Sequence, residues 1–318
     1  MANNVAKFGH EATHGTIATT MLDFNANFKA KMDQTQYVPK ENRNNQDEGF
    51  IAFAGFQHEQ WEAGGGVYHD QIGYIMGMAM GAPTKVVVGG ETVVWDSTFI
   101  PADDPWSCSL QWQQTVDYVQ GFQSLYGVLS DFEINFGAGN ELDWTAKGVA
   151  MPETTISQFT PAVAATKPHV AWQGAVTLGG GAFGSLVNCK IGWKRNRAPF
   201  WVVNNTQAPK RMRKGMRGGN LEIIVDSDAA GLARYTAWKA STKEVLSVVF
   251  VDTSTTLGTS ANPQFTISLP NIVWKAAEID VGGDLPLIKL TADKILYDQT
   301  AGAAIKAIVR SNKDWTTI

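Results

Sequence analysis

The sequence has few of the features that mark several other classes of protein. Its 318 residues include only two cysteines, Cys108 and Cys189, too few for a disulfide framework and without the CxxC spacing of a zinc site. No stretch approaches about 18 consecutive apolar residues, so no membrane helix is predicted. No basic N-terminal region precedes an apolar run, so no signal peptide is expected. We therefore expect two buried thiols in a protein made in a reducing cytoplasm.

Charged residues are also scarce, at 18% of the chain against about a quarter in an average protein. Glycine, with 31 residues, and tryptophan, with 11, are plentiful. Low charge and many large aromatic residues suit a surface covered by neighbouring subunits better than the surface of a free monomer. The composition therefore predicts a β-rich protein that assembles with copies of itself.

A β-hairpin pattern occurs twice in the chain. In the first copy, residues 132–146, apolar residues alternate with Glu133 and Asn135 before a Gly-rich stretch. This alternation predicts a half-buried strand, and the Gly and Asn residues predict a tight reversal. The second copy, residues 277–292, repeats Glu-Ile-Asn/Asp-apolar-Gly at an offset of 145 and Thr-Ala at an offset of 146. Since these offsets are close to half the length of the chain, the sequence predicts two similar β domains in tandem.

The expected first domain is residues 1–155, with an N-terminal arm and a polar loop at 25–48. The expected second domain is residues 168–318, with a basic loop at 194–217, and the Pro-, Thr- and Ala-rich residues 156–167 are expected to link the two.

One short helix is predicted, in the first domain. Apolar residues recur with helical spacing over residues 70–80, with His69 or Asp70 as the expected N-cap and Gly81 as the expected stop. The second domain is predicted to consist of strands joined by short turns, which indicates a sandwich or barrel. These strands are expected at 186–193, 200–203, 221–225, 234–239, 245–252, 265–269, 272–281, 287–290 and 305–309.

Several short motifs suggest chemistry, but none is predicted to be catalytic or to hold a cofactor. His10, Glu11 and His14 match HExxH, which binds zinc only when it lies on a helix, and Gly15 follows at once. We therefore expect no metal there. The triplets 64–66 and 179–181 lack the other residues of a phosphate loop and are expected to be hinges or turns. The acids at 103–104 and 226–228 are expected to form turns, with a weak Ca²⁺ site at either as the alternative.

Charge is distributed most unevenly in residues 194–217, which hold eight cations and no acid. Such a segment suits an acidic face of a neighbouring subunit, while acids elsewhere in the chain would line a channel. The residues expected to contact another subunit or ring are Lys210, Arg211, Arg213, Lys214 and Arg217. DNA binding through the same loop is the alternative, since a basic cluster also suits phosphate contacts.

Three features of the chain resemble tail tube proteins, the major tail proteins of long non-contractile, siphovirus-type bacteriophage tails. They are the Phe-Gly-x-Glu-x-Thr-x-Gly-Thr opening at 8–16, the strand, Gly-rich break and helix ending at Gly81, and the stretches 219–226 and 281–287. The resemblance implies a mainly β fold of two tandem tail-tube β-sandwich or barrel domains, one short helix in the first, closing into a ring with neighbouring subunits.

The resemblance also implies a function. The protein would be a structural virion protein, not an enzyme, and its stacked rings would form the channel for genome ejection. Its partners would be itself, in rings of three two-domain chains or of six chains, adjacent rings, a tape measure protein and a tail terminator. DNA would pass without sequence-specific binding, no membrane would be involved, and assembly would take place in the host cytoplasm. A carbohydrate-binding β-sandwich is the alternative, because exposed Trp and Tyr side chains stack on sugars.

Overall fold

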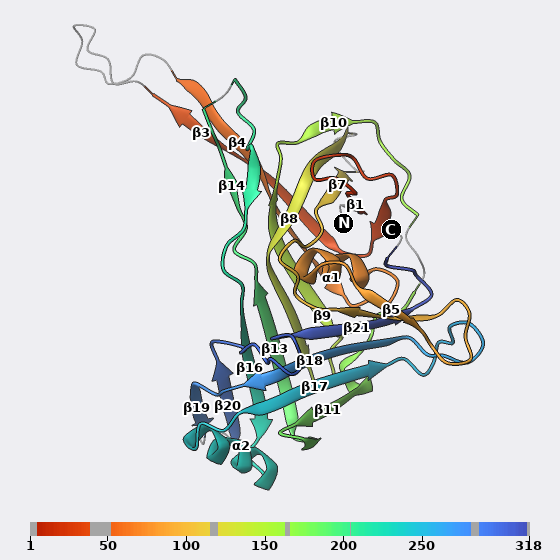
Figure 1. The fold of residues 1–318 in the computed structure, drawn as a ribbon, viewed down its shortest axis with the longest axis vertical. Coiled ribbons are helices and arrows are strands. Elements are labelled where there is room, and N and C mark those ends of the chain that lie inside the picture. Colours follow the sequence, from red (N-terminus) through yellow and green to blue (C-terminus); the bar gives the residue numbers. More distant parts are fainter. Residues whose placement is uncertain are drawn as a thin grey trace, which may run out of the picture.

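The computed structural model describes residues 5–38, 52–114, 120–162, 166–203, 205–280 and 286–316. The fold is mainly β and antiparallel, as predicted, with two large sheets packed face to face around a main hydrophobic core. The strands of one sheet cross those of the other at a large angle (Figure 1), an arrangement that buries apolar side chains of both inner faces. Neither α-helix in the described part of the chain is long and apolar enough to cross a membrane.

The first sheet contains a run of eight neighbouring strands that we call the eight-strand layer. In spatial order they are β3 (Asn27–Tyr37), β4 (Phe53–Gly66), β9 (Asp143–Ala150), β8 (Gln120–Gly137), β13 (Leu186–Lys194), β16 (Gly218–Asp226), β20 (Leu287–Ala292) and β19 (Ala276–Asp280). Both predicted hairpins lie here, as β8–β9 and β19–β20. Strand β13, between them, is paired on both sides, with β8 and with β16.

The long strand β8 belongs to two layers. Its first half leaves the eight-strand layer and pairs with β7 (Cys108–Gln114) and β10 (Thr154–Ile156). On the other side of β7, the sheet continues with β1 (Val5–His10) and then β2 (Leu22–Phe24). The bend lies at Tyr126, whose φ of 53° is in the left-handed region. The Tyr126 backbone N–H donates to the buried Glu11 carboxylate at 2.8 Å. This hydrogen bond helps to hold the strand in its bent form.

The second sheet has seven strands: β12 (Gly181–Ala182), β11 (Gly174–Leu178), β17 (Glu244–Val251), β18 (Gln264–Ile272), β21 (Lys306–Ser311), β6 (Trp95–Phe99) and β5 (Thr84–Val87). Strands β14 (Ala198–Phe200) and β15 (Arg211–Arg213) form a separate pair. A short 3-10 helix, η1, spans Ala171–Gln173. The glycines at 179 and 180 have φ of 65° and 87° in the turn between β11 and β12, as expected for a turn.

The two halves of the chain have the same strand order. In the eight-strand layer, β3-β4-β9-β8 from the first half is followed by β13-β16-β20-β19 from the second. Behind them, β1-β7-β8-β10 has its counterpart in β11-β17-β18-β21. A helix follows the second strand of each set, α1 (Ile72–Met80) after β4 and α2 (Ala229–Lys239) after β16. The hairpin β5–β6 departs from the repeat, because it comes from the first half and pairs with β21 of the second.

Helix α1 is confirmed where the sequence predicts it, and all nine of its residues are buried. Its N-cap is Gln71, not His69 or Asp70, and it makes no side-chain capping bond. A Cβ on Gly77 would lie 2.0 Å from the Trp106 ring, and one on Gly73 would lie 2.2 Å from the Trp315 ring. Both glycines are therefore required for the close approach of α1 to these indoles.

The prediction of a single helix is wrong, because α2 is a second one and occupies residues 234–239, predicted as a strand. Asp228 begins it as N-cap by accepting from the Gly231 backbone N–H at 2.8 Å. Among the residues of α2 only Gly231 is buried. A surface helix of this kind leaves little apolar periodicity in the sequence.

The polar loop predicted at 25–48 is wrong over Asn27–Tyr37, which is strand β3, while residues 39–51 lie outside the described part. The outer half of β3 is exposed or half-buried on both faces, so its sequence lacks the alternation of a half-buried strand. Glycines 64–66 are not a hinge, since they lie inside β4 and pair with β9. A Cβ on Gly65 would lie 2.7 Å from the Asn25 carbonyl oxygen.

The segment expected to link the halves is tied to the first half. Ile156 ends β10, Thr166 Oγ1 donates to the Asp70 carboxylate at 3.1 Å, and the His169 backbone N–H donates to the Val67 carbonyl at 2.9 Å. Both cysteines are buried free thiols, as predicted, and burial raises the pKa of each.

Candidate functional site

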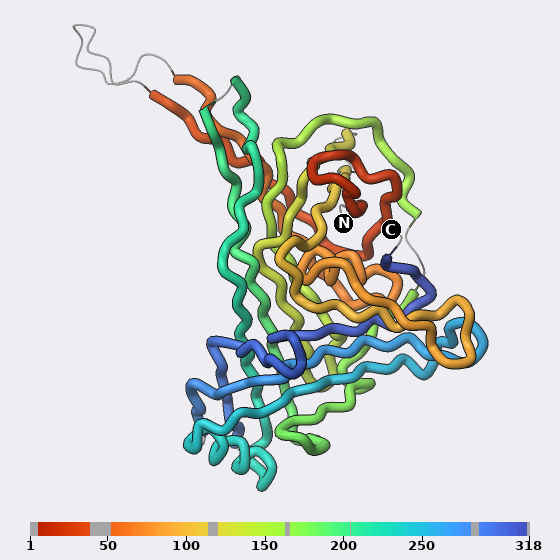
Figure 2. Tube along the Cα trace, viewed as in Figure 1, coloured from red at the N-terminus to blue at the C-terminus, as the bar shows by residue number. Residues whose placement is uncertain are grey.

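Two hairpins project together from the body of the molecule (Figures 1 and 2). One is the outer part of β3–β4, and the other is residues 198–213, which contain β14 and β15. The Gln57 backbone N–H donates to the Gln207 carbonyl at 3.0 Å, and the Trp201 ring stacks on Phe56 with 5.2 Å between centroids. We call these paired hairpins the arm.

Exposed apolar side chains lie on the outer part of the arm that the structure describes. Tyr37 is 54% exposed and Phe53 is 53% exposed, and Val203 of the second hairpin is also exposed. Exposed apolar side chains grouped on a projecting element indicate a surface that another protein covers.

The basic segment 194–217 divides into two parts. Lys214 Nζ lies 2.9 Å from a carboxylate oxygen of Asp104, and Arg217 Nη2 lies 3.1 Å from one of Asp103. The Lys214 hydrogen bond holds the pKa of Asp104 below its ordinary value. Two of the five predicted contact residues thus contact an acidic loop of their own chain.

Two further arginines of this segment are buried. Arg195 Nη2 donates to the Ala102 carbonyl at 2.9 Å, and Arg197 lies 3.9 Å from Asp104. Burial, with Arg197 close by, lowers the pKa of Arg195 to about 10. These side chains hold residues 194–217 against the loop that precedes β7, so they contribute to the fold.

The remaining predicted contact residues lie on the arm. Lys210, Arg211 and Arg213 are exposed on or beside β15. The guanidinium carbons of Arg211 and Arg213 lie 5.3 and 4.3 Å from the centroid of the Phe200 ring. Stacking on an aromatic face orients both groups while leaving them open to solvent.

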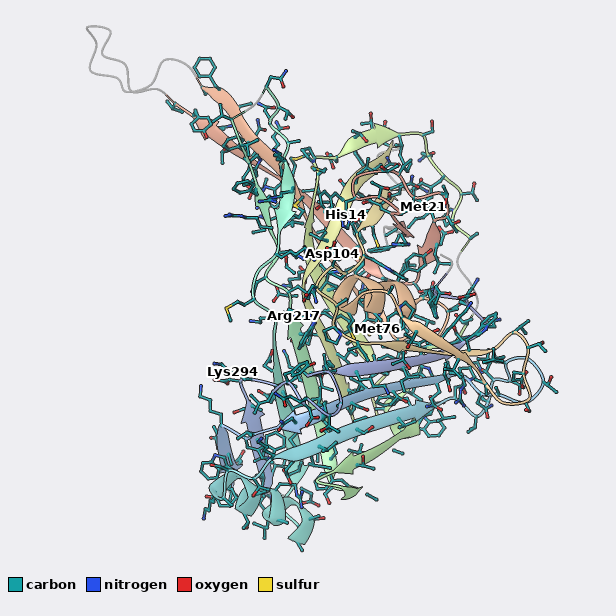
Figure 3. All side chains as sticks on the ribbon, viewed as in Figure 1. His14, Met21, Met76, Asp104, Arg217 and Lys294 are labelled. Atoms are coloured by element: carbon teal, nitrogen blue, oxygen red, sulfur yellow. The ribbon has the colours of Figure 1, made fainter. Side chains whose placement is uncertain are left out.

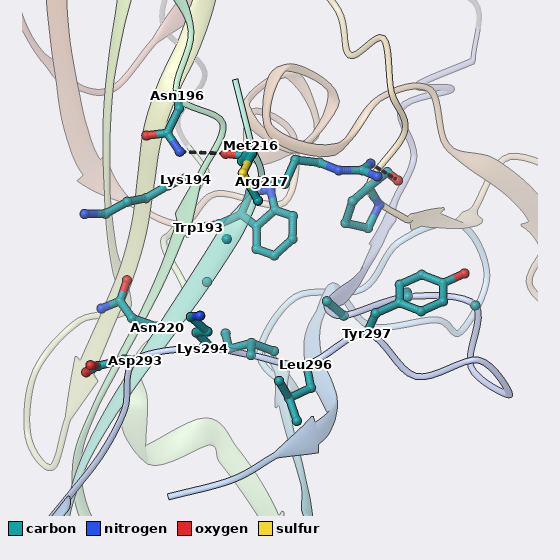
Figure 4. A pocket seen from close by; sticks show the side chains of 17 residues that line it. Trp193, Lys194, Asn196, Met216, Arg217, Asn220, Asp293, Lys294, Leu296 and Tyr297 are labelled. Carbon is teal, nitrogen blue, oxygen red and sulfur yellow. Dashed lines mark hydrogen bonds between the residues drawn. The ribbon is translucent and has the colours of Figure 1, made fainter. Parts of the chain in front are cut away.

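A hollow of about 730 Å³ lies where residues 216–219 and 293–297 meet (Figure 4). Trp193 and Ile295 contribute apolar surface, while Lys194, Arg217 and Lys294 bring positive charge. Arg217 and Lys294 lie on the body below the base of the arm (Figure 3). Asp293 also lines the hollow, so its walls combine apolar surface with charges of both signs.

The HExxH residues do not lie on a helix. Glu11 accepts from the Gly15 and Tyr126 backbone N–H groups and from the hydroxyls of Ser107 and Ser109, at 2.7 to 3.1 Å. His14 stacks on Tyr126 with 5.0 Å between centroids. Glu11 therefore organises the turn after β1. Within the described ranges, no three His, Cys, Asp or Glu side chains come close enough to hold a metal ion.

The outer face of the eight-strand layer carries a row of charges that the sequence does not reveal. From β19 to β3 the signs alternate, one residue on each strand: Glu278, Lys289, Glu222, Lys190, Glu133, Lys147, Glu62 and Lys29. We call this the charge row. Its members face away from the core, because their neighbours along the strands are mostly apolar residues that are buried in the core or packed against it, as Ala277 and Ile279 are on β19.

The two outermost strands of this layer, β3 and β19, have one partner each in the described part of the chain, β4 and β20. An open edge exposes unpaired backbone N–H and C=O groups and can pair with another chain. Inside the chain, β8 and β13 join the two sets of four strands through seven residue pairs, from Asn188 opposite Gly137 to Lys194 opposite Asp131. The halves are thus joined by edge-to-edge pairing.

In a comparison with protein-family models, residues 2–285 of the chain match a family described as phage tail tube protein. A search of curated proteins finds no match.

Proposed function

Because the chain belongs to the phage tail tube protein family, a family of structural virion proteins, we propose that it is the major tube subunit of a siphovirus-type tail. Its rings would stack into the channel for genome ejection. The observation that carries the proposal is the repeated strand order of the eight-strand layer together with its internal β8–β13 junction. The layer already contains one copy of the contact that a ring would need.

The internal junction indicates how neighbouring chains would join. Strand β19 occupies the place in the second half that β8 occupies in the first, and β3 occupies the place of β13. A β19 edge paired with the β3 edge of the next chain would repeat the β8–β13 contact between chains. Closing the circle would leave no open edge in the layer.

The same reasoning favours three chains in a ring. We propose two tandem tube-type domains, residues 1–155 and 168–318, so three chains would supply the six domains that the resemblance implies. Adjacent rings, a tape measure protein and a tail terminator are the proposed partners, DNA is proposed to pass without sequence-specific binding, and assembly is proposed in the host cytoplasm.

Native mass spectrometry of assembled rings is expected to give a mass of three 34.5 kDa chains. Proline at Glu278 or at Ile279 tests the junction, because consecutive residues of a strand direct their N–H groups to opposite sides. One of the two prolines should leave a folded monomer that forms no rings, and the other should weaken the β19–β20 pairing. Rings of six chains would contradict the stoichiometry, and rings formed by both variants would contradict the junction.

The exposed cations of the arm are proposed to contact the adjacent ring. The triple variant Lys210→Gln, Arg211→Gln and Arg213→Gln is expected to form rings but at least about tenfold fewer long tubes, since charge complementarity would be lost between stacked rings. Negative-stain microscopy measures the tube lengths. Lys239→Gln, Lys243→Gln and Lys313→Gln remove the same charge from other exposed positions and should leave the tubes long.

The alternative for these cations, DNA binding, gives a different result. Filter binding of the wild type would then show tight, salt-sensitive retention of DNA that the arm variant loses. Tubes of unchanged length in that variant would rule out the ring contact.

A further inference from the structure

The members of the charge row are paired across strands. Lys289 Nζ lies 3.0 Å from Glu222, and Lys190 Nζ lies 2.9 Å from Glu133. Lys147 Nζ lies 3.4 Å from Glu62. Three of the four lysines therefore have a carboxylate within ion-pair distance on a neighbouring strand.

The strand register places further glutamates and lysines of the row directly opposite each other. Glu278 lies directly opposite Lys289, Lys190 lies opposite Glu222, and Lys29 lies opposite Glu62. Residues directly opposite each other in an antiparallel pair have Cβ atoms about 4.5–5.5 Å apart. Most lysines of the row are thus flanked by carboxylates on both sides, and the four positive charges are balanced by four negative ones.

The rest of this face is mostly polar. Thr145, Asn188 and Thr291 lie beside the row, and Asp131 and Asp143 add negative charge. The outward positions of β17 in the seven-stranded sheet differ, since they include Val245, Val249 and Val251. A polar, charge-balanced face suits contact with water or a highly charged polymer, whereas the valine-bearing face suits contact with protein.

The position of the core decides which face would point inward in a ring. The seven-stranded sheet and α1 pack on the other side of the eight-strand layer (Figure 1). If the layer closes into a circle, this bulk has more room at larger radius. The face with the charge row would then be the wall of the channel.

Resting on the proposed tube function, we propose that the charge row faces double-stranded DNA in the channel and that its glutamates keep its lysines from binding phosphate. Each lysine that neutralises a phosphate releases counterions and adds salt-dependent affinity. Such contacts, repeated in every ring, would hold the moving polymer. A lysine held by carboxylates on adjacent strands is less available, and those carboxylates also repel phosphate.

The test removes the carboxylates and leaves the lysines. The variant Glu62→Gln, Glu133→Gln, Glu222→Gln and Glu278→Gln is expected to bind a short mixed-sequence DNA duplex at least about tenfold more tightly than the wild type at low salt, with affinity falling steeply as salt rises. Fluorescence anisotropy measures both effects. The double variant Glu133→Gln and Glu222→Gln should show a smaller gain in DNA affinity. It replaces the fourfold variant in the test if circular dichroism shows that the fourfold variant folds poorly.

A matched control separates the charge row from total charge. Asp103→Asn, Asp293→Asn, Asp298→Asn and Asp314→Asn make the same change in net charge, and three of these acids also pair with a cation, Arg217, Lys275 or Lys85. This control should gain clearly less affinity than the charge-row variant. An equal gain, or no gain in either charge-row variant, would overturn the inference.

Assembly of the wild type is scored separately. If it forms tubes while the charge-row variants gain no DNA affinity, the inference is wrong and the tube function stands. If concentrated wild-type protein forms neither rings nor tubes, the proposed function fails, and this inference fails with it.

Discussion

Acidification from pH 7 to pH 4 is expected to lower the free energy of unfolding by roughly 3 kcal/mol through His169. This residue is 2% exposed, and neither ring nitrogen makes a hydrogen bond of ordinary geometry, although the Gln173 side chain lies nearby. Burial, with His69 nearby, lowers the pKa of His169 to about 4, although Asp252 opposes the shift. Burial also lowers the pKa of His69, against the effect of Asp70 and Asp252.

The direction of the effect follows from which state binds the proton first. In the unfolded chain a histidine is protonated as the pH falls through about 6.5, whereas His169 in the folded chain resists protonation until about pH 4. The contribution of His169 to stability is therefore complete above about pH 6.5 and is lost progressively between these two values.

Urea denaturation at a series of pH values measures this loss. The variant His169→Leu lacks the buried imidazole, so its stability should fall by about 3 kcal/mol less than that of the wild type over this range. His14→Gln removes a partly exposed histidine and leaves His169 in place. This variant should therefore lose as much stability on acidification as the wild type does. An equal decline in His169→Leu and the wild type would show that the acid sensitivity arises elsewhere.

Replacing Glu59 with leucine is expected to stabilise the protein by about 2 kcal/mol at pH 7.5. Glu59 is 0% exposed at the base of the arm, on β4 opposite Ala150 and Met32, and neither carboxylate oxygen has a hydrogen-bond partner of ordinary geometry. Burial, with Glu153 nearby, raises its pKa to about 8, although the Lys31 backbone amide opposes the shift. The folded chain therefore holds a protonated carboxyl group where the unfolded chain holds an ionised one.

Because the folded pKa of Glu59 is raised, its cost to stability grows as the pH rises above about 4.5 and levels off above about 8. Glu59→Leu should therefore be more stable than the wild type at pH 8 and gain much less at pH 5, as measured by urea denaturation. Gln60→Leu, at the exposed neighbouring position, should show no such pH-dependent gain. Loss of stability in Glu59→Leu at every pH would contradict the expectation.

The parts of the fold that the sequence predicts correctly are those with a local pattern. Alternation in 132–136 and 277–281 indicates the hairpins that become β8–β9 and β19–β20. Helix α1 is equally clear because its apolar residues recur with helical spacing. Helix α2 is missed because it buries only Gly231, and β3 is missed because its outer half is exposed on both faces.

The candidate surfaces depend on contacts between residues far apart in the sequence. Lys214 and Arg217 belong to a basic run, but only the folded chain brings Asp103 and Asp104 against them. Lys210, Arg211 and Arg213 remain as the exposed cations of the arm. In the charge row, each glutamate and lysine lies in a different strand, and no local pattern links Glu133 to Lys190.

The sequence by itself determined a β-rich chain with a repeated hairpin and one buried helix, because alternation and helical spacing decide locally which side chains leave water. Only the tertiary structure decided that the two sets of four strands join edge to edge at β8 and β13, with β3 and β19 each left with one partner among the described residues. It also decided that eight charges of alternating sign lie in one row. Strand order and register are set by backbone pairing across the whole chain, and a shift of a single residue would turn each charge of a strand toward the core.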